Sequence, residues 1–281
     1  MADQLEEKHS RKRPKNRRRQ KQVKKIAVKN GLTILYSNVD TLSNKRPALE
    51  REIFVHNPDI ICLTEILAKR TERRALEEEL QYPGYKTLHN LETAKRGVCI
   101  LAKESLGMTE SVKLQEAVDF QEAVIGEMSL RGNDRLVVAC IYRSDSSSAH
   151  SNTRMCEMIR NTLPSCGASH ILCVGDFNCP DIDWIDLTST LPQDTVNVQA
   201  AVLEAFQDSF LTQHVTECTH FKPHCKPSLI DLVWTNEEGM VKNLEHVGTL
   251  GFSHHSLIKF ELTVSEPPRV SEPRPGPTEQ G

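Results

Sequence analysis

Short apolar runs of strand length recur along the middle of this 281-residue chain, each bounded by polar residues or glycine. Several are apolar throughout, which is typical of strands buried on both faces. Segments between them have apolar spacing near 3.6 residues and predict helices, the middle one opened by Ser or Asn as a cap. The sequence therefore predicts an α/β fold in which helices cover sheets. The predicted strands are 32–37, 59–64, 97–102, 122–130, 135–142, 170–175, 228–234 and 255–262, and the predicted helices are 45–56, 151–163 and 197–211.

The two ends of the chain differ in composition from the region between them. Residues 8–25 hold 11 Lys/Arg and no Asp/Glu, and residues 265–281 carry five prolines. Neither composition can bury a packed core. We expect a disordered basic arm at 1–25, one domain at 26–264 and a disordered Pro-rich tail at 265–281.

The overall charge of −3 conceals an asymmetry, because residues 26–281 hold 24 bases against 35 acids, a net charge of −11. A basic arm on an acidic domain favours a polyanionic partner or a nuclear-import receptor for residues 8–25. The alternative is a solvated tail without a partner. No window approaches the ~20 apolar residues of a membrane span, and the basic N-terminus lacks the apolar core of a secretory signal, so we expect no membrane association.

Cysteine is frequent but irregularly spaced, with nine residues in the chain. An odd number without regular spacing argues against a disulfide framework and favours buried free thiols in a reducing compartment. Four lie inside apolar runs: Cys62, Cys99, Cys140 and Cys173. The His/Cys-rich segment 218–225 has a spacing that matches no common zinc site, and it is interpreted as a loop.

Polar residues follow the apolar strands where each strand ends, the place where α/β folds carry their sites. They are Asn38, Asp40, Glu65, Asp176 and Asn178, with Asp231 inside one run and His254 and His255 before the last. Each one alone is as well explained by a turn or a helix cap. As a set they are less well explained by turns and caps, because burying an unpaired Asp231 between Ile230 and Leu232 costs several kcal/mol.

This set of side chains favours metal-assisted phosphoester hydrolysis. Carboxylate and amide oxygens suit Mg²⁺, an imidazole can bind a phosphate oxygen, and an aspartate can orient water. The chain has no P-loop, no G-x-S-x-G and no H-E-x-x-H, so NTP switching, acyl transfer and zinc proteolysis have no support.

The ordered stretches NVDTLSNKRPAL, NPDIICLTEIL, KRGVCI, CIYRSD, GDFNCPDIDW, LIDLVWTN and GFSHHSLI resemble the endonuclease/exonuclease/phosphatase superfamily. More narrowly they are similar to the apurinic-endonuclease-like domain of non-LTR retrotransposons. The resemblance covers about residues 28–264. It implies a four-layer α/β/β/α sandwich with two mixed sheets face to face, and a catalytic centre at one rim of the sheets.

The resemblance also implies roles at the metal site. Glu65 matches the principal Mg²⁺ ligand, with Asn38 and Asp40 beside it. The usual Ser-Asp-His stands here as Ser253-His254-His255, so His254 replaces an acidic residue of the site. Because a neutral imidazole supplies no negative charge and is a poor Mg²⁺ ligand, we expect impaired Mg²⁺ dependence, partly relieved by Mn²⁺.

The remaining residues match catalytic positions of the family. Asp176 matches the residue that activates or orients water, with Asn178 as its partner, and Tyr142 matches a contact to the phosphate or leaving group. Asp231 and His255 match a pair in which the carboxylate fixes the imidazole against the phosphate. The implied substrate is a DNA backbone.

Three functions therefore stay open. The first is a monomeric, Mg²⁺-dependent DNA endonuclease acting in the nucleus. The second is a catalytically weak or inactive nucleic-acid-binding module, which His254 favours. The third is a phosphatase acting on a small phosphoester, since the superfamily includes such enzymes.

Overall fold

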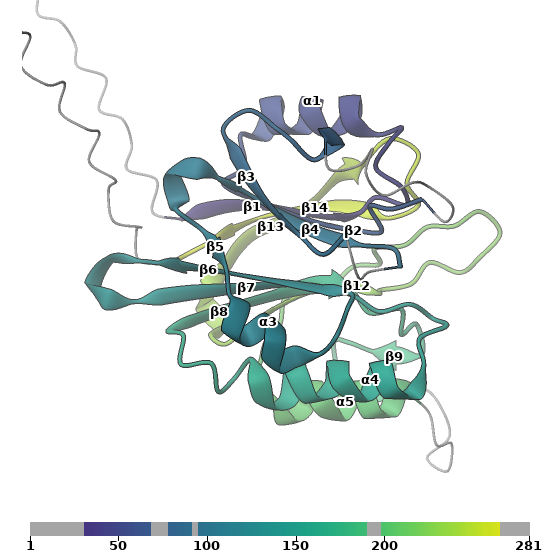
Figure 1. Cartoon of the computed structure of the whole chain (residues 1–281). Helices are drawn as coiled ribbons and strands as arrows, with labels where there is room; N and C mark the ends of the chain where they lie inside the picture. The colour runs from purple at the N-terminus through teal and green to yellow at the C-terminus, as the bar shows by residue number, and fades with distance from the viewer. Residues whose placement is uncertain (1–30, 69–77, 92–94, 190–197, 265–281) are drawn as a thin grey trace, which may run out of the picture.

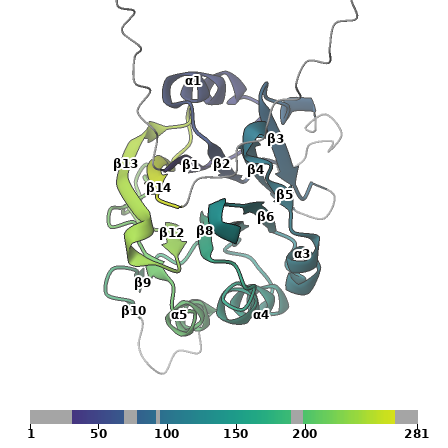
Figure 2. The same cartoon turned by 90° about the vertical axis from the view of Figure 1, so that its left-hand side faces the viewer.

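Two six-stranded sheets lie face to face, with helices on their outer sides (Figures 1 and 2). The computed structural model describes residues 31–68, 78–91, 95–189 and 198–264. The predicted basic arm and Pro-rich tail lie outside the described residues, so their disorder stays a prediction.

The first sheet is built around the N-terminal strand. Its order is β13 (Val241–Thr249), β14 (Ser256–Leu262), β1 (Leu32–Asn38), β2 (Ile60–Thr64), β4 (Val98–Lys103) and β3 (Tyr85–His89). Strands β1 and β2 are parallel, and the other neighbours in this sheet are antiparallel.

The second sheet repeats this mixed arrangement. Its order is β11 (Thr212–Gln213), β12 (Asp231–Thr235), β8 (His170–Asp176), β7 (Arg135–Tyr142), β6 (Ala123–Ser129) and β5 (Thr109–Glu110). Only β7 and β8 are parallel in it. Strands β9 (Ile182–Asp183) and β10 (Thr188–Ser189) form a separate antiparallel pair.

Helices close the sandwich on both outer sides, as Figure 1 shows. Helix α1 (Arg46–His56) covers the first sheet, and the second is covered by α3 (Val112–Val118), α4 (Ala149–Glu157) and α5 (Val198–Asp208). A π-helical turn at Met158–Thr162 continues α4, and 3₁₀ turns occupy Glu104–Leu106, Arg131–Asn133 and Glu238–Met240. The predicted four-layer α/β sandwich is therefore confirmed.

Each predicted strand and helix is present, but the start of α4 was predicted two residues late and the start of β12 three residues early. The Oγ of Ser148 accepts a hydrogen bond from the backbone N–H of Ser151, so Ser148 is the N-cap rather than Ser151 or Asn152. Strands β3 and β13, the two-residue strands β5, β9, β10 and β11, and helix α3 were not predicted. The first two lie at the edges of their sheet and are only partly buried, so their sequences lack continuous apolar runs.

The buried side chains form three layers of core. The central layer between the sheets includes Tyr36, Cys62, Cys140 and Phe260, all fully buried. On the outer side of the second sheet the rings of Phe206 and Trp234 stack at 4.0 Å. The thiols of Cys62, Cys99, Cys140 and Cys173 are free and buried, as predicted. Among the described residues, no helix has both the length and the apolar character that crossing a membrane requires.

Candidate active site

The ends of four strands meet at one rim of the sandwich. Because β1 and β2 run parallel in one sheet and β7 and β8 run parallel in the other, each pair ends at the same edge. In the second sheet Asp176 is the register partner of both Tyr142 and Asp231. This topology brings together residues that lie far apart in the sequence.

Asn38 joins the two sheets at this rim. Its side-chain amide nitrogen donates to Glu65 Oε1 at 2.9 Å and to Asp176 Oδ2 at 2.8 Å. Its amide oxygen accepts from the backbone N–H of Asp40 at 3.0 Å. As the amide is oriented here, Asn38 holds two carboxylates side by side rather than presenting its oxygen to a cation.

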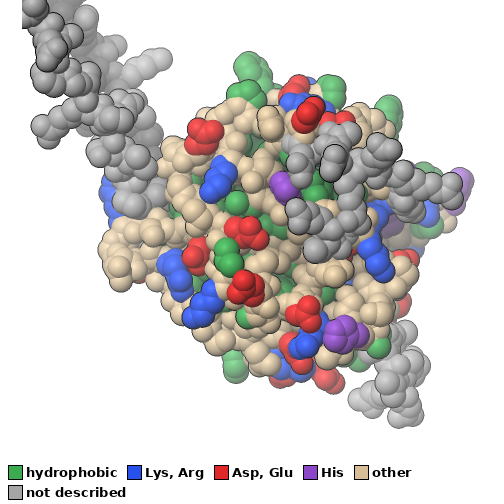
Figure 3. Space-filling view, viewed as in Figure 1, with side chains coloured by type: hydrophobic (Ala, Val, Ile, Leu, Met, Phe, Trp, Pro, Cys, Tyr) green, Lys and Arg blue, Asp and Glu red, His purple; other side chains and the backbone are tan. Residues whose placement is uncertain are grey.

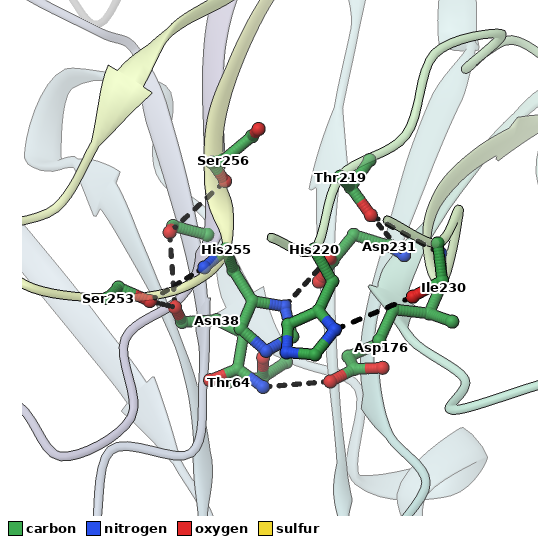
Figure 4. A network of polar contacts seen from close by, with 12 residues as sticks. Asn38, Thr64, Asp176, Thr219, His220, Ile230, Asp231, Ser253, His255 and Ser256 are labelled. Atoms are coloured by element: carbon green, nitrogen blue, oxygen red, sulfur yellow. Dashed lines mark hydrogen bonds and ion pairs between the residues drawn. The ribbon is translucent and has the colours of Figure 1, made fainter. Parts of the chain in front are cut away.

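Asp231 and His255 form the second connected group (Figure 4). His255 Nδ1 lies 2.8 Å from Asp231 Oδ2, and the hydroxyl of Tyr36 donates to Asp231 Oδ1 at 2.8 Å. The Oγ1 of Thr219 accepts from the backbone N–H of Asp231 at 3.0 Å. Asp231 is fully buried, and its two oxygens are both engaged. The carboxylate therefore fixes the orientation of the imidazole.

Arg143, which was not identified from the sequence, hydrogen-bonds to the turn after β8. Arg143 Nη1 donates to the carbonyls of Phe177 and Asn178 at 3.1 and 3.0 Å, and Asn178 Nδ2 donates back to the carbonyl of Arg143 at 2.7 Å. The backbone N–H of Asn178 donates to Asp176 Oδ1 at 3.0 Å. Asn178 is thus the partner of Asp176, and its left-handed φ of 47° suits an asparagine.

Left-handed backbone conformations recur in the loops that follow β1 and β2. Glu65 has φ 54° and Thr41 φ 78°, which are costly for residues with a long or β-branched side chain, and Asp40 has φ 38°. The N–H of Thr41 donates to the carbonyl of Glu65 at 2.8 Å, and the buried ammonium of Lys45 donates to the carbonyl of Asp40 at 2.7 Å. Strain maintained by surrounding contacts is typical of a functional loop.

A cleft of about 880 Å³ opens in front of these groups and is lined by Glu65, Tyr142, Asn178, His254 and His255 among others. Tyr142 is nearly buried, whereas His254 is exposed. The backbone carbonyl of His254 accepts from the N–H of Phe221, and among the described residues its side chain forms no ion pair with a carboxylate. The ring of His220, from the loop that the sequence predicted, lies 4.6 Å from the ring of His255.

Burial changes the proton affinity of the site. Burial, and next the charge of Asp231, raise the pKa of Asp176 to about 8. For His255, burial lowers the pKa, but the contact with Asp231 outweighs it and raises the pKa to about 9. Burial, and next the carboxylates of Glu65 and Asp176, raise the pKa of Tyr142 well above its ordinary value. Near neutral pH the imidazole is therefore cationic and Asp176 readily takes up a proton.

The donor set fits a divalent cation at Glu65. One oxygen each of Glu65 and Asp40 converge on a positively charged group, since both accept from the guanidinium of Arg96. The ligand atoms of Asp176, Asp231 and His255 also lie within 4.8 Å of one another. In this structure the members of that second cluster are engaged in hydrogen bonds, Asp231 with Tyr36 and His255, and Asp176 with Asn38.

All the predicted site residues lie at this rim, but not in one contact group. Asn38 hydrogen-bonds to both Glu65 and Asp176. The side chain of Asp40 is exposed and pairs with Arg96, and the side chain of His254 is exposed at the cleft. Tyr36, Arg96 and Arg143 were missed. Tyr36 precedes Asn38 by two residues on β1 and so faces the same side of the strand, which is a signal that the sequence did contain.

Acidic and basic side chains are interspersed on the face of the molecule shown in Figure 3. The cleft lining itself mixes Lys95, Arg96 and Lys222 with acids that include Asp119, Glu122 and Asp145. The described domain therefore presents no strongly basic surface at its cleft.

Comparison with family models finds one match, to the endonuclease-reverse transcriptase family over residues 136–259. A comparison with curated proteins finds no match. The matched segment includes Tyr142, Asp176, Asn178, Asp231 and His255, and stops short of the whole domain.

Solved structures match nearly all of the described chain. The endonuclease domain of TRAS1, a telomere-specific non-LTR retrotransposon, has a TM-score of 0.61 at 12% identity and covers 84% of this chain and 100% of its own. The AP endonuclease LMAP from Leishmania major has a TM-score of 0.62 at 13% identity, covering 83% and 88%. The 3′ phosphatase NExo from Neisseria, bound to a product DNA hairpin, has a TM-score of 0.58 at 15% identity, covering 82% and 99%.

Proposed function

We propose that this chain, whose described domain has the fold of the endonuclease/exonuclease/phosphatase superfamily, is a metal-dependent phosphodiesterase that cleaves DNA. The observation that carries the proposal is the convergence of two groups at one cleft. One is Glu65 joined to Asp176 by Asn38, and the other is His255 fixed by Asp231. The natural cation is Mg²⁺, which prefers carboxylate oxygens, and Mn²⁺ can replace it.

His255 is the group that binds and neutralises the phosphate. With Nδ1 held by Asp231, its Nε2–H is left to donate to a phosphoryl oxygen in the cleft. Its raised pKa keeps it cationic at neutral pH. The phenol of Tyr142, at the cleft wall, donates a second hydrogen bond to the phosphate or to the leaving oxygen.

Asp176 takes the proton of the attacking water. Burial places its pKa at about 8, near the pH at which a general base works best, and the N–H of Asn178 and the amide of Asn38 orient its two oxygens. A divalent ion bound by Glu65, with Asp40 and Asn38 beside it, would supply charge neutralisation on the phosphate and the leaving oxygen. His254 adds no negative charge there, so we expect slow turnover with Mg²⁺ and faster turnover with Mn²⁺.

DNA is the proposed substrate, and the structural neighbours that act on DNA support it. Since the cleft is not strongly basic, the Lys/Arg-rich arm at 8–25 would supply contacts to phosphates that do not depend on sequence. The same arm would serve as an import signal for a nuclear, monomeric enzyme of retrotransposon type.

A plasmid-nicking assay tests the proposal. The wild-type protein is expected to nick supercoiled DNA with Mn²⁺ and more slowly with Mg²⁺. Glu65→Gln is expected to abolish nicking, whereas Glu245→Gln, which removes a carboxylate that pairs with Lys259 and does not line the cleft, leaves it unchanged. His254→Asp restores a carboxylate and is expected to raise the rate with Mg²⁺ by roughly 10-fold or more.

The same assay separates the two alternatives. If the wild type and His254→Asp both bind DNA in a salt-sensitive way but do not nick it, the protein is a nucleic-acid-binding module. This is the alternative that His254 favours. Release of inorganic phosphate from a 3′-phosphorylated strand, without nicking, would identify a phosphatase like the Neisseria neighbour.

A further inference from the structure

Arg96 places a positive charge at the point where the metal-side carboxylates converge. Its Nη2 donates to Glu65 Oε2 and, at 3.0 Å, to Asp40 Oδ1. The side chain is only 10% exposed, and it lines the cleft. A cation that belongs to the chain therefore occupies the position that the proposed function assigns to a divalent ion.

The guanidinium is incompletely satisfied in this position. Its Nε–H is buried and has no hydrogen-bond partner among the described residues. Buried arginines with a purely structural role usually have their donors paired, because an unpaired buried N–H is costly. Arg96 is thus held chiefly through one nitrogen and by charge, an arrangement that a stronger cation can displace.

The backbone of Arg96 is fixed independently of its guanidinium. The N–H of Leu67 donates to the carbonyl of Arg96 at 2.7 Å, and the N–H groups of Arg96 and Gly97 donate to the carboxylate of Glu122 at 3.0 Å. Gly97 has φ 72°, and a Cβ there would approach the Leu67 side chain to 3.1 Å. Changing the end of the Arg96 side chain therefore leaves the loop next to Glu65 in place.

We infer that Arg96 is an internal cation that competes with the divalent metal for Glu65. The inference rests on the proposed function, because it assumes that the metal binds at Glu65. A doubly charged ion beside a guanidinium is repelled, so the metal binds only when the guanidinium leaves Glu65. In the metal-free protein the same contact relieves the repulsion between Glu65 and Asp40. Arg96 thereby lowers the metal affinity while it keeps the empty site assembled.

Titration with Mn²⁺, with the free ion followed by its electron paramagnetic resonance signal, tests the inference without measuring activity. Arg96→Gln is expected to bind Mn²⁺ at least about 10-fold more tightly than the wild type, since the competing charge is gone. Arg96→Lys keeps the charge and is expected to bind as weakly as the wild type. Arg46→Gln is the matched control, because it removes the same charge from the start of α1, where Arg46 pairs with Glu50.

A second measurement uses the wild-type protein and so does not depend on the folding of a variant. The Arg96 Nε–H signal, assigned by its loss in the ¹⁵N spectrum of Arg96→Lys, is expected to shift when Mg²⁺ is added. Equal Mn²⁺ affinity of the wild type and Arg96→Gln, or an Arg96 signal that stays unchanged at saturating Mg²⁺, would overturn the inference and leave the proposed function intact. If neither protein binds Mn²⁺, both the inference and the metal dependence are overturned.

Discussion

The pairing of His255 with Asp231 sets the charge of the imidazole. The carboxylate outweighs the effect of burial and raises the pKa of His255 to about 9. Asp231→Asn is expected to remove that contribution, so that burial dominates and the pKa of His255 falls below its ordinary value. Activity at pH 7.5 is expected to fall roughly 100-fold or more, because the imidazole loses both its charge and its orientation. An NMR titration of the imidazole carbons measures the pKa directly.

Tyr36→Phe is the control for this prediction. It removes the hydroxyl that donates to Asp231 Oδ1 but leaves the contact between Asp231 and His255 in place. The pKa of His255 is therefore expected to stay raised. A pKa that remains near 9 in Asp231→Asn would show that another group carries the effect.

At the residue scale the sequence could predict which side chains gather at one rim of the sheets, but not what each of them contacts. Asp231 between two apolar residues was recognisable because an unpaired buried charge is costly. The guanidinium of Arg96 on Glu65 was not, because that contact joins residues 31 positions apart through a loop conformation. The orientation of the Asn38 amide also depends on tertiary contacts. That orientation decides whether Asn38 links the carboxylates of Glu65 and Asp176 or offers its oxygen to a cation.

At the scale of elements, Gly175 allows β8 to pack closely against the neighbouring strand β7. A Cβ at this position would lie 2.1 Å from the carbonyl oxygen of Ile141, so no other residue fits without separating the strands. Gly175→Ala is expected to lower the free energy of unfolding by about 1–3 kcal/mol. Because Asp176 is the next residue, activity should fall by more than the loss of folded protein explains. Urea unfolding measures the stability.

Gly239→Ala provides the matched comparison, since a Cβ there would meet nothing within 4 Å. It is expected to leave both the stability and the activity unchanged. If both variants unfold at the same urea concentration, the close approach of β8 to β7 has no energetic significance.

The elements themselves were predictable where a strand is buried on both faces. The runs that became β1, β2, β4, β7 and β8 are almost fully buried, and their sequences are predominantly apolar. Strand β13 escaped prediction because its exposed edge carries polar residues and its pairing with β14 is interrupted by register shifts. Its existence depends on the neighbouring strand rather than on its own sequence.

At the scale of the whole molecule, the sandwich concentrates ionisable groups where strands from both sheets end. Folding brings Asp176, Asp231 and His255 into one buried cluster, so part of the folding free energy depends on their protonation. Distance along the chain gave no indication of this coupling, which arises only when the two parallel strand pairs face each other.

The metal-free protein is therefore expected to lose stability as the pH rises from 6 to 9. The folded pKa of His255, about 9, lies above the unfolded value of 6.5, so its contribution is complete below pH 6.5 and is lost as the pH approaches 9. Asp176, with a folded pKa of about 8 against 3.8 unfolded, keeps a proton that the unfolded chain releases, so its contribution also falls until pH 8. Together these shifts predict a loss of at least about 2 kcal/mol, measurable by urea unfolding in EDTA. Asp176→Asn should make the decline shallower, and equal stability at pH 6 and 9 in the wild type would contradict the buried protonation equilibrium.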